Sequence, residues 1–193
     1  MSVQAPWNDL LAEPLPRDHL VQLYHDDRVL IEAVALFAGR GLGKGEGVIL
    51  VAARPHLDAL ERRLTQDGFE VDDFKRWRQL TVLDAEEMLS RFMVDGTPDA
   101  ERFKSLAGGV IASTRAAGWR KVRIYGEMVN VIWKQNLAGA ARLEQLWNEV
   151  IQTFSVSLFC AYGVARDGEA RRRFPSELRE AHSRLIPFQA VSK

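Results

Sequence analysis

Arg54 and His56 are the residues whose types and position most directly suggest chemistry, because they follow a run of consecutive apolar residues, 47–53. A guanidinium and an imidazole can hold an anionic or hydrogen-bonding ligand, and an imidazole titrates near neutral pH. A phosphate-binding loop would place glycines here, followed by a lysine and a hydroxyl residue. Segment 52–58 contains none of these residue types, so we expect no ATP hydrolysis at this turn. The competing interpretation of Arg54 and His56 is an exposed helix start with solvated charges.

Two further side chains are candidates for a ligand pocket. Glu127 follows another predicted strand, 122–125, and is either a polar anchor for a ligand or a helix N-terminal carboxylate favoured by the helix dipole. Trp133 lies a few residues later and either lines a pocket or belongs to the core. The sequence leaves both alternatives open.

The four histidines and the single cysteine give no recognisable metal-binding pattern. His19, His25, His56 and His182 are widely separated, and Cys160 has no second cysteine near it. Zinc motifs usually show closely spaced ligand pairs, so we expect no metal site. Cys160 lies in an apolar run, which favours a small buried side chain over a reactive thiol. A lone cysteine also excludes an internal disulfide and fits a reducing compartment.

Composition restricts the class of protein and its partners. The chain has 193 residues, of which 47% are hydrophobic and 27% charged, as expected for one domain with a substantial core. Lysine plus arginine and aspartate plus glutamate each number 26, so no net field attracts nucleic acid or a membrane surface. Apolar runs are far shorter than the roughly 20 residues that span a bilayer. We therefore expect a cytoplasmic protein without nucleic-acid or membrane partners.

Alternating strand and helix patterns predict an α/β fold. It should have three layers, with a mostly parallel sheet and helices on both faces. The predicted strands are 19–24, 47–53, 80–83, 122–125 and 156–162. In such sheets ligands bind beyond the carboxyl ends of the strands, so the segments that follow these strands should converge on one edge.

The domain organisation is expected to be simple. Residues 1–17 carry three prolines and predict a mostly irregular N-terminal arm with one helical turn near 7–12. Residues 18–187 then form a single domain, and residues 188–193 form a C-terminal tail.

Several short motifs, taken together in their order and spacing, resemble a known family. They are HLVQLY at 19–24, GLGKGE at 41–46, FMVDG at 92–96, VRIYGEM at 122–128, LEQLWN at 143–148, SLFCAY at 157–162 and AHS at 181–183. This set resembles the MEDS domain, a sensory module of methanogens and methylotrophs named partly for a dichloromethane-responsive regulator. That family is related to the RecA/KaiC-like P-loop fold. The resemblance covers roughly residues 19–187.

The resemblance implies sensing of small molecules, proposed to be hydrocarbon derivatives, in a domain usually fused to a kinase or a DNA-binding output. We expect no output domain in this chain and therefore expect signalling through a separate kinase or transcription regulator. His19 and Tyr24 lie in a segment shared with the family and are expected to donate or accept hydrogen bonds to the ligand. For His19 the competing interpretation is a structural histidine whose hydrogen bonds are satisfied within the protein. Together with Arg54, His56, Glu127 and Trp133 they form the predicted ligand site at the carboxyl edge.

Three functional hypotheses follow. The first is a non-catalytic sensory domain of the MEDS type, on a degenerate RecA/KaiC-like fold and without a cofactor. The alternative is a divergent nucleotide-binding protein or ATPase of RecA/KaiC type that kept the ancestral site in altered form. The third is a scaffold without a ligand, which uses a helical face for homo- or hetero-oligomerisation.

Overall fold

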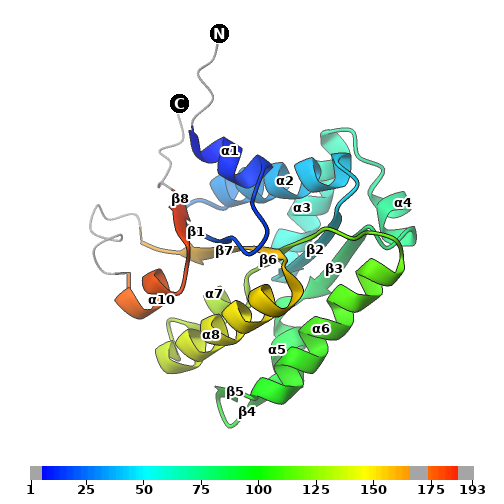
Figure 1. Ribbon diagram of the computed structural model, residues 1–193. Helices are drawn as coiled ribbons and strands as arrows, with labels where there is room; N and C mark the ends of the chain where they lie inside the picture. The colour runs from blue at the N-terminus through cyan, green and yellow to red at the C-terminus, as the bar shows by residue number, and fades with distance from the viewer. Residues whose placement is uncertain (1–5, 166–173, 187–193) are drawn as a thin grey trace.

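The computed structural model describes residues 6–165 and 174–186, and within them it has a six-stranded sheet between two layers of helices (Figure 1). The order across the sheet is β3-β2-β6-β7-β1-β8, and every neighbouring pair is parallel. The strands are β1 (His19–Tyr24), β2 (Gly47–Ala52), β3 (Leu80–Asp84), β6 (Val122–Gly126), β7 (Ser157–Gly163) and β8 (Arg184–Ile186). The predicted three-layer α/β architecture is confirmed.

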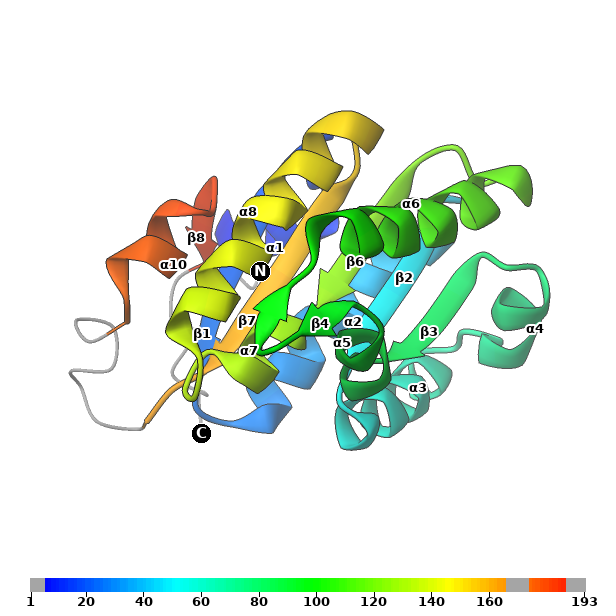
Figure 2. The same cartoon turned by 90° about the horizontal axis from the view of Figure 1, so that it is seen from below.

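The helices divide between the two faces of the sheet. One face is covered by α1 (Pro6–Ala12), α2 (Asp27–Gly43) and α3 (Arg54–Gln66), with α4 (Val71–Arg76) after them. The other face, seen from below in Figure 2, is covered by α5 (Ala85–Phe92), α6 (Ala100–Ala116), α7 (Met128–Ile132), α8 (Leu137–Phe154) and α10 (Ser176–Glu180). Both faces of the central strands are therefore buried, which explains their consecutive rather than alternating apolar residues.

Local signals in the sequence set several helix starts. The side chains of Asp26, Asp84, Asp99 and Asn136 each accept a hydrogen bond from a backbone N–H in the first turn of the following helix. A short antiparallel hairpin, β4 (Met93–Val94) with β5 (Thr97–Pro98), lies between α5 and α6 and was not predicted. Strands of two residues give too little pattern to recognise from the sequence.

The N-terminal segment forms helix α1 where one helical turn was expected. Helix α1 packs on α2, and Leu11 is fully buried between them and the sheet. The buried guanidinium of Arg123, on β6, donates to the carbonyls of Phe37 at 2.8 Å and Leu11 at 3.4 Å. Its Nε donates to Glu46 Oε2 at 2.7 Å, which neutralises the buried charge. Residues 6–12 thus pack as part of the domain. The predicted tail, 188–193, lies outside the described residues.

Candidate functional site

Four polar side chains gather where the central strands end. Tyr24 ends β1, His56 lies in the first turn of α3 just beyond β2, and Glu127 and Asn130 follow β6. Because all these strands are parallel, their carboxyl ends meet at one edge of the sheet. We call Tyr24, His56, Glu127 and Asn130 the edge cluster. The sequence had predicted the first three at this edge, and the structure brings them together.

Glu127 is the centre of the edge cluster and is only 2% exposed. Its Oε2 accepts a hydrogen bond from the backbone N–H of Ala53 at 3.0 Å, and its Oε1 lies 2.7 Å from His56 Nδ1. An ionised carboxylate only accepts hydrogen bonds, so His56 Nδ1 carries the proton. The buried charge is therefore balanced by two donors from the segment that follows β2, which ties the end of β2 to the end of β6.

Asn130 extends this network to two more strands. Its Nδ2 donates to Tyr24 Oη at 3.2 Å and lies 3.4 Å from Glu127 Oε1, while its Oδ1 accepts from the backbone N–H of Gly163 at 2.8 Å. Tyr24 and Gly163 end β1 and β7. One connected set of hydrogen bonds therefore joins the ends of β1, β2, β6 and β7.

The electrostatics of the edge cluster follow from burial and from the Glu127 charge. The hydrogen bond to Glu127 raises the pKa of His56 above its ordinary value, although partial burial opposes this. Burial raises the pKa of Tyr24, and the nearby negative charge of Glu127 raises it further. At neutral pH Tyr24 is thus a neutral hydroxyl, and the cluster favours protonated His56.

His56 forms the solvent-facing side of the edge cluster. Its side chain is 16% exposed, and its Nε2 lies 3.6 Å from the Asp27 carboxylate, which is 73% exposed. The ring also contacts Tyr24, with 6.5 Å between the ring centroids. The accessible part of the cluster is therefore an imidazole beside an acidic group.

Neither of the strand-to-helix turns beside the edge cluster is built for phosphate. Residues His25 and Asp26 connect β1 to α2, and Ala53 alone connects β2 to α3. Both turns lack glycine, lysine and hydroxyl residues, and the first adds carboxylates that repel an anion. Pro55 stands in the first turn of α3, where it has no N–H to offer.

Arg54 does not point into the edge cluster. Its side chain is 72% exposed and pairs with Asp58 one turn along α3, at 3.5 Å. This geometry agrees with the competing interpretation of Arg54, which is a solvated charge at the start of a helix. The sequence could not separate Arg54 from His56 because both stand in the first turn of α3, and only the direction of each side chain decides which one meets Glu127.

His19 and Trp133 do not belong to the edge cluster. His19 begins β1 and Tyr24 ends it, so the expectation that both lie at the carboxyl edge is wrong. Six strand residues separate the two ends by roughly 17 Å. Trp133 is partly buried against Tyr162 and Phe174, with ring centroids 5.8 and 5.9 Å away. Its position is that of a core residue.

Asn130 and Asp27 were missed by the sequence analysis. Each stands within three residues of a recognised candidate, and both lie directly beyond a strand that the sequence predicted. They could have been found from the rule that the residues after parallel strands converge at one edge of the sheet.

A small apolar void lies in the core of the described residues, under α5, α6 and α8. Its walls include Ile49, Met88, Phe103, Ile124 and Trp147, and the free space is about that of one water-sized sphere. Such a void is a packing defect of the core rather than a formed binding site.

Comparison with known proteins gives a family for this chain. The family model described as "MEthanogen/methylotroph, DcmR Sensory domain" matches residues 18–184. The chain belongs to the MEDS family. The match includes β1 to β7 and all four residues of the edge cluster. No curated protein matches the chain.

The MEDS chain also resembles a solved structure. The KaiC-like protein PH0186 from the hyperthermophilic archaeon Pyrococcus horikoshii OT3 matches with a TM-score of 0.58 and 11% sequence identity, over 88% of this chain and 71% of that one. At this identity the likeness concerns the fold alone. The predicted RecA/KaiC-like fold is confirmed.

In the described part of the chain, no helix is both long enough and apolar enough to cross a bilayer.

Proposed function

We propose that this MEDS domain is a non-catalytic sensor that binds a small organic molecule at the edge cluster and signals through a separate protein. The observation that carries the proposal is the hydrogen-bond network centred on Glu127, which joins four strand ends at the edge where parallel sheets bind ligands. The sensory family supports the same role.

The charges at the mouth of the cluster favour a ligand with a hydrogen-bond donor. Glu127 and Asp27 are carboxylates on either side of His56. A primary amine or a small alcohol can donate to such groups, whereas a phosphate or carboxylate ligand would be repelled. We therefore propose a neutral or cationic molecule with an N–H or O–H group.

The network also offers a route from ligand to partner. A ligand that competes for Asp27 or Glu127 must change the position of His56, which bonds to both groups. Movement of Glu127 then alters its bond to the Ala53 N–H and its contact with Asn130. A ligand switches a partner only when it favours one of two such arrangements. The proposed partner is a kinase or a transcription regulator that reads the surface around α3 and α7.

A thermal-stability screen with primary amines, small alcohols, halocarbons and ATP with magnesium tests the proposal. A ligand at about 100 times its dissociation constant stabilises the folded state by about 2.7 kcal/mol. For a domain of this size that raises Tm by roughly 5–10 °C. We expect an amine or alcohol to give such a shift and nucleotides to give none.

Two matched variants locate the binding. Glu127→Gln keeps the shape of the side chain but removes the charge, so it should abolish the ligand-induced shift. Glu101→Gln makes the same change at an exposed position on α6 and should retain the shift. Stabilisation by ATP and magnesium, accompanied by phosphate release, would instead support the ATPase alternative and contradict the sensor.

A further inference from the structure

A second polar cluster lies inside the protein, near the amino end of β1 and far from the edge cluster. It consists of His19, Glu144, Cys160 and His182, which we call the inner cluster. They come from β1, α8, β7 and the turn after α10. Their side chains are 2% exposed or less. One nitrogen, oxygen or sulfur atom from each of the four lies within 4.8 Å of all the others.

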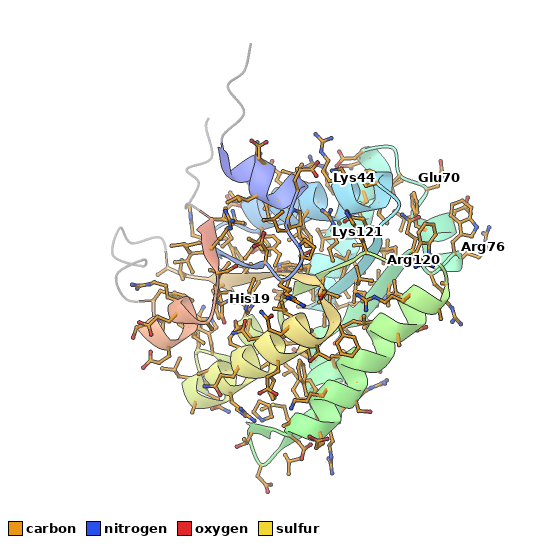
Figure 3. All side chains as sticks on the ribbon, viewed as in Figure 1. His19, Lys44, Glu70, Arg76, Arg120 and Lys121 are labelled. Carbon is orange, nitrogen blue, oxygen red and sulfur yellow. The ribbon has the colours of Figure 1, made fainter. Side chains whose placement is uncertain are left out.

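These four residues are far apart in the sequence, and no local pattern connects them. His19 and His182 are 163 positions apart, but β8 pairs with β1 and returns the C-terminal segment to the start of the sheet. The backbone N–H of Ser183 donates to the carbonyl of His19 at 2.9 Å, which sets the two histidines side by side. Their ring centroids are 4.1 Å apart. Figure 3 shows His19 in the interior, between the sheet and α8.

Outer hydrogen bonds set the protonation of both imidazoles. Asn148 Nδ2 donates to the carbonyl of Ala181 at 2.9 Å, so its Oδ1 faces His19 Nδ1, at 3.0 Å, as an acceptor. His182 Nδ1 donates to the carbonyl of Leu178 at 2.6 Å. In neutral imidazoles the lone pair is then on Nε2 of each ring. Carbonyl partners of this kind are what orient metal-binding histidines in proteins.

The inner cluster consequently has more acceptors than donors. His19 Nε2 lies 3.3 Å from Glu144 Oε2, and His182 Nε2 lies 3.3 Å from Glu144 Oε1. Tyr162 donates its hydroxyl to Glu144 Oε1. Glu144 Oε2 and His182 Nε2, both buried, have no hydrogen-bond partner. Buried acceptors that lack a donor are costly unless a proton or a metal ion lies between them and their neighbours.

The spacing of the four atoms fits a small metal ion. In a tetrahedral zinc site, bonds of about 2.0 Å to nitrogen and oxygen and about 2.3 Å to sulfur place ligand atoms about 3.3 Å apart, or about 3.5 Å for a nitrogen and a sulfur. The two nitrogen–oxygen distances in the inner cluster are 3.3 Å, and His19 Nε2 lies 3.5 Å from Cys160 Sγ. The two separations that start at His19 Nε2 are close to edges of such a tetrahedron, and His182 Nε2 lies beside the other oxygen of the same carboxylate.

We propose that His19, Glu144, Cys160 and His182 bind one zinc ion through Nε2, a carboxylate oxygen, Sγ and Nε2. Two imidazoles, a carboxylate and a thiolate form a donor set that suits zinc better than magnesium or calcium, which prefer oxygen ligands alone. Binding requires the Cys160 thiol to lose its proton, which a divalent cation favours.

Four protein ligands in a closed, buried site are typical of structural zinc. Here the ion would tie the turn after α10, and with it β8, to β1, β7 and α8. Figure 2 shows these elements side by side. This site lies apart from the edge cluster, so the proposal goes beyond small-molecule sensing and does not depend on it.

Elemental analysis of the full chain, purified without a metal-chelating column, tests the proposal. We expect one zinc per chain. Cys160→Ser and His182→Gln should each lower zinc affinity by more than the about 10–100-fold that the loss of an outer partner costs. His25→Gln removes an imidazole outside the cluster and should retain the ion. Asn148→Ala, which removes only the outer partner of His19, should lie between these results.

Cobalt substitution separates the inner cluster from other metal-binding places on the protein. The metal-free chain refolded with Co²⁺ should show the intense visible absorption of a four-coordinate ion and a sulfur-to-cobalt charge-transfer band. The charge-transfer band should be absent from Cys160→Ser, while Glu127→Gln should show both features, even if it binds no small molecule. The proposal is overturned if the chain contains no transition metal and takes up neither Zn²⁺ nor Co²⁺, or if both ligand variants bind as the unchanged chain does.

Discussion

The edge cluster and the inner cluster each have a buried glutamate beside histidine, but their donors and acceptors are balanced differently. Glu127 receives hydrogen bonds from the Ala53 N–H and from His56, so its charge has donors on both oxygens. Glu144 instead faces two imidazole nitrogens whose outer hydrogen bonds leave lone pairs toward it. The two sites are therefore alike in burial and residue type. They differ in whether N–H groups or lone pairs point toward the glutamate.

Because of this difference, we expect small molecules to exchange at the edge cluster and the inner cluster to stay fixed. At the edge, His56 is partly exposed, and a ligand or water can replace its hydrogen bond. In the interior Glu144 and the two imidazoles are buried, and the proposed zinc ion would balance the acceptors. We expect the edge cluster to respond to small molecules and the inner cluster to contribute to stability.

Removal of Glu144 should have the largest effect. In the zinc-loaded protein, Glu144→Ala removes a buried ligand and leaves two imidazoles and the Tyr162 hydroxyl without their partner. Breaking a buried charged network in this way costs about 3–5 kcal/mol of the free energy of unfolding. Urea denaturation monitored by circular dichroism measures it. Glu144→Gln, which keeps the volume, should lose less but still bind zinc weakly. An unchanged or higher stability of Glu144→Ala would show that the acceptors were never balanced by a cation.

Removal of Glu127 should cost less. Glu127→Ala deprives the Ala53 N–H and His56 of their acceptor, but His56 can turn to water. Hydrogen bonds to a charged group contribute about 1.5–3 kcal/mol each, and the solvent-facing one is partly replaced. We expect a loss of about 1.5–3 kcal/mol by the same denaturation measurement. A loss larger than that of Glu144→Ala would reverse the proposed order of the two clusters.

Tyr24→Phe should have a smaller effect again. The change removes only the hydroxyl that accepts from Asn130 Nδ2, and Asn130 keeps its bond to the Gly163 N–H. One neutral hydrogen bond contributes about 0.5–1.5 kcal/mol. The expected result is a small loss of stability with full zinc content, measured on the same sample by denaturation and elemental analysis. Loss of zinc in this variant would mean that the two clusters are coupled.

The pH dependence of His56 should be the most modest effect. The bond to Glu127 raises the pKa of His56 above its ordinary value of 6.5, so protonation favours the folded state. Its contribution to stability is full below the unfolded-state pKa and is lost as the pH rises through the higher folded-state pKa. We expect the stability difference between the unchanged chain and His56→Gln to be largest at acid pH and to fall above about pH 6.5. A difference that stays constant or grows with pH would contradict the His56–Glu127 pairing.

The sequence predicted the fold and part of the edge cluster for the same reason. Consecutive apolar runs identified the strands, and the parallel arrangement then brought Tyr24, His56 and Glu127 to one edge. The same reasoning, applied to the direction of β1, would have placed His19 at the opposite end. The error arose because the whole segment 19–24 was assigned to the carboxyl edge, although His19 lies at the other end of the strand.

The inner cluster was beyond local pattern reading, because it depends on β8 returning to β1. One signal was nevertheless present. Glu144 stands among Leu143, Leu146 and Trp147 on the buried face of α8, and a glutamate is rarely fully buried without a partner. Arg123 in the apolar strand β6 is the same kind of signal, and it too lies in a buried ionic network. Both buried ionic networks could have been suspected from these charged residues within apolar segments.

Backbone NMR of the ¹⁵N-labelled chain during titration with a primary amine or small alcohol tests the central claim most directly. The amide protons of Ala53 and Gly163 donate into the edge cluster, whereas that of Ser183 donates to His19 beside the inner cluster. We predict saturable shifts of the Ala53 and Gly163 signals, with Ser183 unchanged and no response to ATP with magnesium. Shifts centred on Ser183, or shifts of the edge amides by ATP alone, would contradict a small-molecule sensor at the carboxyl edge.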